Sequence, residues 1–264
     1  MTSPLDVPAP VTIHIAWWAV TGFVAIVGLL FGSFLNVVIY RVPRRLSVVK
    51  PRSFCPRCET PVRALDNIPV LSWLMLRGRC HQCRGPISIR YPLVELGTAV
   101  VFAAIGWGLG PHWAVAGFCV LAATLVALVA IEADGLNPPL SAAAVGTAIG
   151  ALLLIGAGAA DHRWPRVVGV LIGVAVAAVL VAVKTPWAGS APVLLPVGAV
   201  LGWLGLASAG EGLATAAIVL VAARSVGKSD GTEHPVPEVL GLALAVGAVA
   251  ATVIAIATGA GTGR

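Results

Sequence analysis

Residues 17–40 read WWAVTGFVAIVGLLFGSFLNVVIY, an apolar run of 24 residues without a charged side chain. A helix needs about 20 such residues to cross roughly 30 Å of hydrocarbon. The hydrophobic core of a signal peptide is shorter, at about 7–15 residues, and follows a basic segment. No Lys or Arg precedes this run. We therefore expect a retained membrane-spanning helix here.

The composition of the whole chain extends this prediction. Of the 264 residues, 58% are hydrophobic and 11% are charged, whereas soluble domains carry about 25% charged residues and disordered chains are poor in apolar residues. We expect an all-α integral membrane protein, a polytopic bundle of about eight helices, with seven as the alternative. The continuous runs exclude the alternating pattern of a membrane barrel. The expected spans are 17–40, 92–110, 113–132, 139–160, 167–184, 191–206, 211–223 and 236–258.

Positive charge is concentrated in one segment. Of the 17 Lys and Arg residues, 11 lie between Arg41 and Arg90. Loops on the cytoplasmic side of a membrane are enriched in such residues, so we expect this loop to be cytoplasmic and the protein to be a multi-pass protein of the inner (plasma) membrane. We read the net charge of +6 as a topology signal, with the lipid bilayer and no nucleic acid as partner. The expected units are an N-terminal helix (1–40), the loop (41–91) and a helix bundle (92–264).

The loop contains two cysteine pairs, Cys55-Pro-Arg-Cys58 and Cys80-His-Gln-Cys83, separated by 21 residues. Two such turns supply the four thiolates that a tetrahedral structural zinc prefers. Two disulfides or free thiols are the alternatives, and a reducing cytoplasmic face disfavours disulfides. We predict Cys55, Cys58, Cys80 and Cys83 as zinc ligands, and we expect Cys119, in an apolar run, to be a packing residue.

Four segments resemble the N-terminal half of the type IV prepilin peptidases: GSFLNVVIYRVP (32–43), NIPVLSW (67–73), RGRC (77–80) and PISIRYPLVEL (86–96). The resemblance implies a membrane aspartic endopeptidase that removes the leader of type IV pilin-like precursors on the cytoplasmic side. It also implies N-methylation of the new terminus, with S-adenosylmethionine as the methyl donor. The precursors are the implied protein partners.

The resemblance also implies two catalytic aspartates, and here the sequence differs. The first motif falls on 131–139 and places Glu132 at the aspartate position, whereas the second places Pro192 there. A carboxylate pair works by sharing a proton, and proline has none to share. We take Glu132 and Asp134 as candidate catalytic residues, because Asp134 is the nearest acid that could replace the second aspartate; Glu211 is expected at the outer end of a span.

Three functions remain open. The chain is an active peptidase that uses Glu132 with a second acid, or a relative in which proteolysis is lost or impaired while the metal loop persists, or a non-enzymatic membrane scaffold in pilus or secretion-system assembly. Glu132 and Asp134 are alternatively a solvated helix end. Glu95 is either a functional acid, as intramembrane acids commonly are, or a buried structural acid paired with an arginine of the loop.

Overall fold

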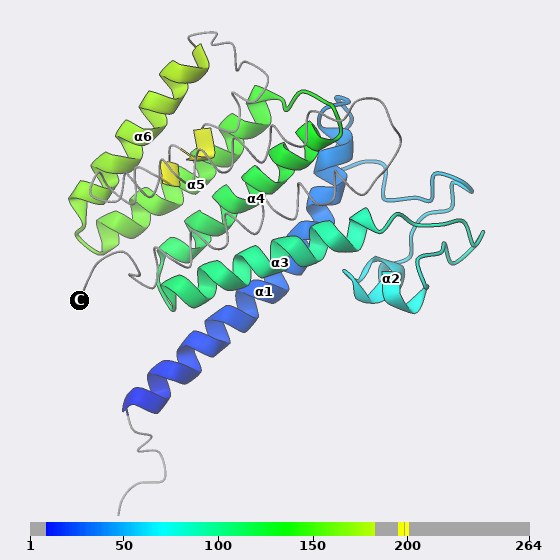
Figure 1. The fold of residues 1–264 in the computed structure, drawn as a ribbon, viewed down its shortest axis with the longest axis horizontal. Helices are drawn as coiled ribbons and strands as arrows, with labels where there is room; N and C mark the ends of the chain where they lie inside the picture. The colour runs from blue at the N-terminus through cyan, green and yellow to red at the C-terminus, as the bar shows by residue number, and fades with distance from the viewer. Residues whose placement is uncertain (1–8, 183–194, 198, 201–264) are drawn as a thin grey trace, which may run out of the picture.

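The structure, a computed structural model, describes residues 9–182, 195–197 and 199–200, and the elements of this part are helical apart from two isolated β-bridges. Four stretches are long and apolar enough to cross a membrane: Ala16–Arg41, Arg90–Leu109, Ala114–Ala133 and Leu140–Ala160. The elements in chain order are α1 (Ala9–Arg41), η1 (Ala64–Asn67), α2 (Leu71–Met75), α3 (Arg90–Leu109), α4 (Ala114–Ala133), α5 (Leu140–Ala160) and α6 (Trp164–Ala182) (Figure 1).

The first four expected spans are therefore confirmed as apolar helices, with ends within a few residues of those expected apart from the start of α1. Helix α1 begins earlier than expected, at Ala9, and α6 overlaps the fifth expected span. The sixth expected span, except for residues 195–197 and 199–200, and all of the seventh and eighth lie outside the described residues.

Helices α1 and α3 are in backbone contact. A Cβ atom added at Gly28 would lie 2.7 Å from the Cα of Ala99, and one added at Gly32 would lie 2.6 Å from the Cα of Glu95. Because no side chain fits at such distances, both positions of α1 require glycine. Small residues of this kind allow membrane helices to approach closely.

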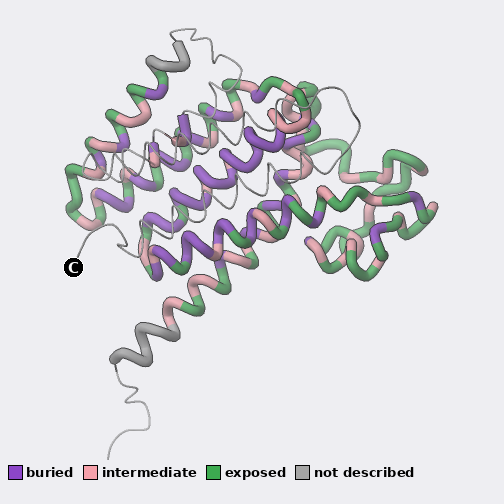
Figure 2. Tube along the Cα trace, viewed as in Figure 1, coloured by how far each residue is buried: buried purple, intermediate pink, exposed green. Residues whose placement is uncertain are grey.

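Helix α4 forms the centre of the described bundle. Its side chains Leu121, Ala130 and Ile131 are fully buried, and buried residues follow the helix along most of its length (Figure 2). Helix α5 instead exposes large apolar side chains, among them Val145 and Leu152. Exposed apolar side chains on a long apolar helix are typical of a surface that contacts lipid.

Polar contacts connect the helix ends at both ends of the bundle. At one end, His112 after α3 pairs with Asp161 after α5 through Nε2 and Oδ2, 2.7 Å apart. At the other end, Arg90 at the start of α3 pairs with Asp134 after α4. The loop that joins α1 to α3 and the turn after α4 therefore lie at the same end of the bundle.

Candidate functional site

The two cysteine pairs of the loop adopt the same backbone geometry. In the first pair, the Glu59 N–H donates to the Cys55 carbonyl (2.8 Å). In the second, the Arg84 N–H donates to the Cys80 carbonyl (3.0 Å). Glu59 and Arg84, each directly after the second cysteine of its pair, have φ near +55° and +59°. The sequence thus builds two equivalent turns that aim two thiols each in one direction.

These turns bring the four thiols together. All four Sγ atoms lie within 4.8 Å of one another, and the Sγ atoms of Cys55 and Cys83 are 3.8 Å apart. A tetrahedral zinc with Zn–S bonds of about 2.3 Å separates its sulfurs by about 3.8 Å. Four half-buried thiols at this spacing fit one zinc ion, and no thiol of the loop is in a disulfide.

The thiols differ in acidity. Hydrogen bonds from the Thr60 hydroxyl and backbone N–H lower the pKa of Cys58 to about 6. A hydrogen bond from the Gly85 N–H lowers the pKa of Cys83. Burial and the neighbouring cysteine side chains outweigh this effect and raise that pKa to about 11. Four negative thiolates repel one another at this distance, so a bound cation is what would allow all of them to deprotonate.

Glu95 of α3 attaches the loop to the membrane helices. Its side chain is buried, and Oε2 accepts a hydrogen bond of 2.6 Å from the Val70 N–H at the start of α2. Glu95 is thus a buried acid, as in the structural alternative, but its partners include the Val70 N–H and the Ser33 side chain in place of the arginine given in that alternative. Val70 has a φ of +60°, an unfavourable conformation for a β-branched residue, so this hydrogen bond helps to hold a strained turn.

Other side chains fix the base of the loop. Trp73 Nε1 donates to the Ile87 carbonyl (3.1 Å), and Asn36 Nδ2 of α1 donates to the Tyr91 carbonyl of α3 (3.2 Å). Arg41, which is also buried, donates to the Ser47 carbonyl (2.9 Å). The residues shared with the peptidase motifs therefore include several that join the loop to the helices.

The two candidate acids lie in the turn that ends α4. The Leu136 N–H donates to the Ile131 carbonyl and the Gly135 N–H to the Glu132 carbonyl, with Gly135 at a φ of +68°. This is a glycine-terminated helix end of the kind that a glycine with positive φ commonly forms. Glu132, half-buried, occupies the last turn of α4, and Asp134 is its C-cap residue.

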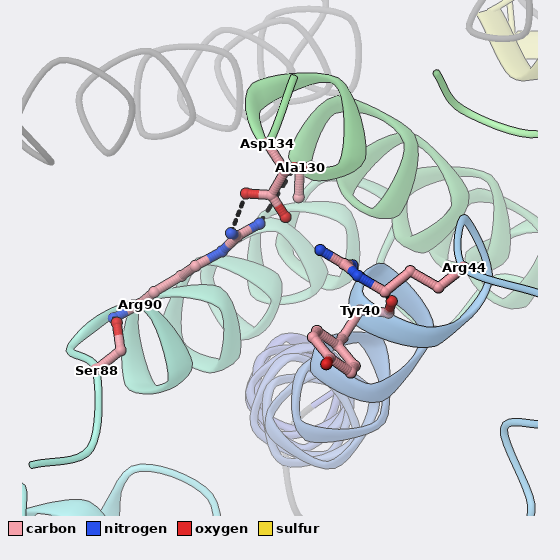
Figure 3. A network of polar contacts seen from close by, with 6 residues as sticks. All are labelled: Tyr40, Arg44, Ser88, Arg90, Ala130 and Asp134. Carbon is pink, nitrogen blue, oxygen red and sulfur yellow. Dashed lines mark hydrogen bonds and ion pairs between the residues drawn. The ribbon is translucent and has the colours of Figure 1, made fainter. Parts of the chain in front are cut away.

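Asp134 is held by an arginine from another helix. Arg90 NH1 binds Asp134 Oδ1, and Arg90 NH2 donates to the Ala130 carbonyl at 3.1 Å (Figure 3). The guanidinium thus lies at the C-terminus of α4, where a cation is favoured by the exposed carbonyls. Asp134 has a structural partner, and Pro192 and Glu211 lie outside the described residues.

The sequence reasoning missed the role of Arg90 and the partner of Glu95. In the sequence, Arg90 contributes only one more positive charge to the loop. A usable signal was present, because an arginine at the first position of a helix is unfavourable next to the positive end of the helix dipole. Such a residue is expected to find a carboxylate or carbonyl nearby.

Comparison with known proteins gives these residues a context. Residues 26–109 match the model of the bacterial peptidase A24 N-terminal domain. The chain is 41% identical over 156 residues to the prepilin leader peptidase/N-methyltransferase of Neisseria gonorrhoeae, covering 50% of this chain and 52% of that protein. It is 47% identical over 131 residues to the protein of the same name from Myxococcus xanthus, covering 50% of this chain and 39% of that protein.

A third relative, the type 4 prepilin-like proteins leader peptide-processing enzyme of Escherichia coli, is 45% identical over 127 residues, which cover 40% of this chain and 46% of that protein. The matched segments span between 39% and 52% of the length of these curated relatives. No solved structure matches the chain. The matched domain contains the cysteine loop, Glu95 and the α1–α3 contact. In this domain, the chain is similar to the type IV prepilin peptidase family.

Proposed function

We propose that this chain is a membrane-bound member of the prepilin-processing enzymes in which leader cleavage is lost or strongly impaired. The observation that carries the proposal is the pair of residues at the positions implied for the catalytic aspartates, Glu132 and Pro192. Peptide hydrolysis by a carboxylate pair needs one group to activate water while the other polarises the scissile carbonyl. Proline supplies neither function.

The nearest substitute acid does not restore the pair. Asp134 follows Glu132 by two residues in the same turn, and its carboxylate is bound by the Arg90 guanidinium. A carboxylate committed to an ion pair that closes the end of α4 is poorly placed to exchange a proton with Glu132. This contact supports a structural role for Asp134 rather than the role of a second catalytic acid.

In this proposal the cysteine loop keeps its role. Cys55, Cys58, Cys80 and Cys83 would hold one zinc ion, which would supply folding free energy to a segment with few buried apolar side chains. A pilin-like precursor is the proposed partner. The relatives' name includes N-methyltransferase. Methyl transfer from S-adenosylmethionine to the N-terminal amine of the precursor is the activity that we propose persists.

One experiment separates the possible activities. The full chain is purified in detergent and incubated with a prepilin-type precursor, and in parallel with the same pilin already cleaved, each with S-adenosylmethionine. Mass spectrometry is expected to show an intact leader in the first reaction and a methylated amine in the second. Absence of both products favours the scaffold function, and efficient leader loss contradicts the proposal.

A gain of function tests the same reasoning. Loss of one member of a cooperating catalytic set commonly costs on the order of 10⁴-fold in rate. The double variant Glu132→Asp with Pro192→Asp is therefore expected to recover measurable cleavage that neither single variant shows. Measurable cleavage by the wild-type chain, at the same rate as by the double variant, would contradict a role for these two positions.

We also propose that the loop faces the cytoplasm from the inner membrane. Cysteines introduced at Arg45 in the loop and at His162 after α5 lie at opposite ends of the described helices. A membrane-impermeant maleimide is expected to label the His162 position in intact cells and the Arg45 position only after lysis. The reverse pattern would invert the topology.

A further inference from the structure

The short helix α2 exposes an apolar face. Leu71, Leu74 and Met75 are 57%, 56% and 81% exposed, and their spacing of three and four residues places them on one side of the helix. Leu65 of the preceding η1 is 77% exposed as well. In the described part of the chain, no helix covers this cluster of apolar side chains. Other exposed apolar side chains of the loop, such as Val49 and Phe54, lie outside α2.

The depth of α2 along the bundle follows from one hydrogen bond. The Val70 N–H at its start reaches the carboxylate of Glu95 (2.6 Å), and Glu95 is five residues after Arg90, where α3 begins. At 1.5 Å per residue, this contact lies about 7.5 Å along α3 from its first residue. Helix α2 is thus folded back beside the first turns of a helix long enough to span a membrane.

The picture agrees with this placement. Figure 1 shows α2 near the start of α3, on the side away from α4, α5 and α6, so that the bundle does not cover it. The first turns of a spanning helix pass through the headgroup region. An apolar side chain that is exposed at this depth and outside the bundle faces lipid rather than water.

Exposed arginines follow the apolar helix in the sequence. Arg77 and Arg79, directly after α2, are exposed, and residues 41–90 contain 11 Lys and Arg against two acidic residues, Glu59 and Asp66. Juxtamembrane basic clusters are attracted to anionic lipid headgroups. Apolar side chains flanked by arginines are the composition of a helix that lies in a membrane interface.

We propose that α2 is an interfacial anchor of the cysteine loop. Leu71, Leu74 and Met75 insert between headgroups and acyl chains of the leaflet on the loop's side, and Arg77 and Arg79 bind the phosphates of anionic phospholipids. Interfacial helices bury their apolar face about 5–10 Å below the headgroups, which matches the depth set by Glu95. The inference depends only on the chain's residing in a membrane, and it holds whether or not the protein cleaves a leader.

The test uses the photoreactive residue p-benzoylphenylalanine in the full chain. It replaces Met75 in one variant and Gln82, an exposed residue between Cys80 and Cys83, in the control. Both are reconstituted into nanodiscs of phosphatidylcholine, with or without phosphatidylglycerol, and irradiated. Mass spectrometry of the digested protein identifies lipid adducts. Circular dichroism verifies folding, and a variant at Leu74 serves if the Met75 variant misfolds.

The proposal predicts lipid adducts at position 75 in excess of those at 82, with a higher yield when phosphatidylglycerol is present. Each arginine near an anionic surface is worth about fivefold in binding, so Arg77→Gln with Arg79→Gln is expected to lower the ratio of docked to undocked loop on the order of 30-fold. Equal adducts at 75 and 82, or crosslinks from 75 to the chain itself, would overturn the anchor. If the yield of lipid adducts at position 75 is the same with and without phosphatidylglycerol, and the same in the arginine double variant, the role of anionic lipid is overturned.

Discussion

Glu95 offers a sharp test of how the loop is attached to the helices. Its buried carboxylate accepts the Val70 N–H at 2.6 Å. In Glu95→Ala that partly buried N–H loses its acceptor, and leaving a buried donor unsatisfied costs about 1–3 kcal/mol, which is the upper range here. The Glu95→Gln variant keeps an acceptor oxygen of similar reach, so it is the matched control. We expect the Glu95→Ala variant to open the start of α2 more often, and the Glu95→Gln variant to change this opening much less.

Hydrogen exchange measures this effect directly. A cost of about 1–3 kcal/mol corresponds to local opening that is roughly 5 to 150 times more frequent. Peptides covering residues 68–76 should therefore exchange faster by about that factor in Glu95→Ala, while peptides from α4 remain unchanged. Identical exchange of these peptides in the wild-type chain and Glu95→Ala would refute the attachment of the loop through this carboxylate.

Three further predictions concern the loop and the turn after α4. Metal analysis should find about one zinc per chain, lost in Cys80→Ser and retained in Cys119→Ser; a folded protein without metal would contradict the site. Zinc content should fall as the pH is lowered, because protons compete for the thiolates, and more steeply below about pH 6, where the metal-free Cys58 thiol is also protonated; constant content between pH 8 and 5 would be inconsistent with thiolate ligands. Arg90→Ala should lower stability by about 1–3 kcal/mol and Asp134→Asn by less, because asparagine still accepts a hydrogen bond; thermal unfolding in detergent measures both, and unchanged midpoints would exclude the Arg90–Asp134 contact.

The helices were predictable because each is defined by local composition. A run such as 17–40 must be helical in lipid, since no other backbone arrangement satisfies its own hydrogen bonds there. The cysteine pairs were equally readable, because their spacing alone determines which four thiols converge. The thiols indeed lie within 4.8 Å of one another.

The polar partners were not predictable in the same way. Which group Glu95 binds depends on the fold of the loop around Val70, and composition favoured an arginine because the loop contains so many. Likewise, the sequence favours Asp134 as a replacement acid, because it follows Glu132 by two residues. Only the three-dimensional packing of α3 against α4 brings Arg90 to it.

The most direct test of the central proposal is the rate of leader cleavage by the unmodified chain. It is compared with the leader peptide-processing enzyme of Escherichia coli on one precursor in the same membranes, with Glu132→Gln measured beside the wild type. We expect cleavage at least on the order of 10⁴-fold slower than that of the comparison enzyme, with no further loss in Glu132→Gln. Cleavage at a comparable rate that Glu132→Gln abolishes would contradict the proposal and require a second acid elsewhere in the chain.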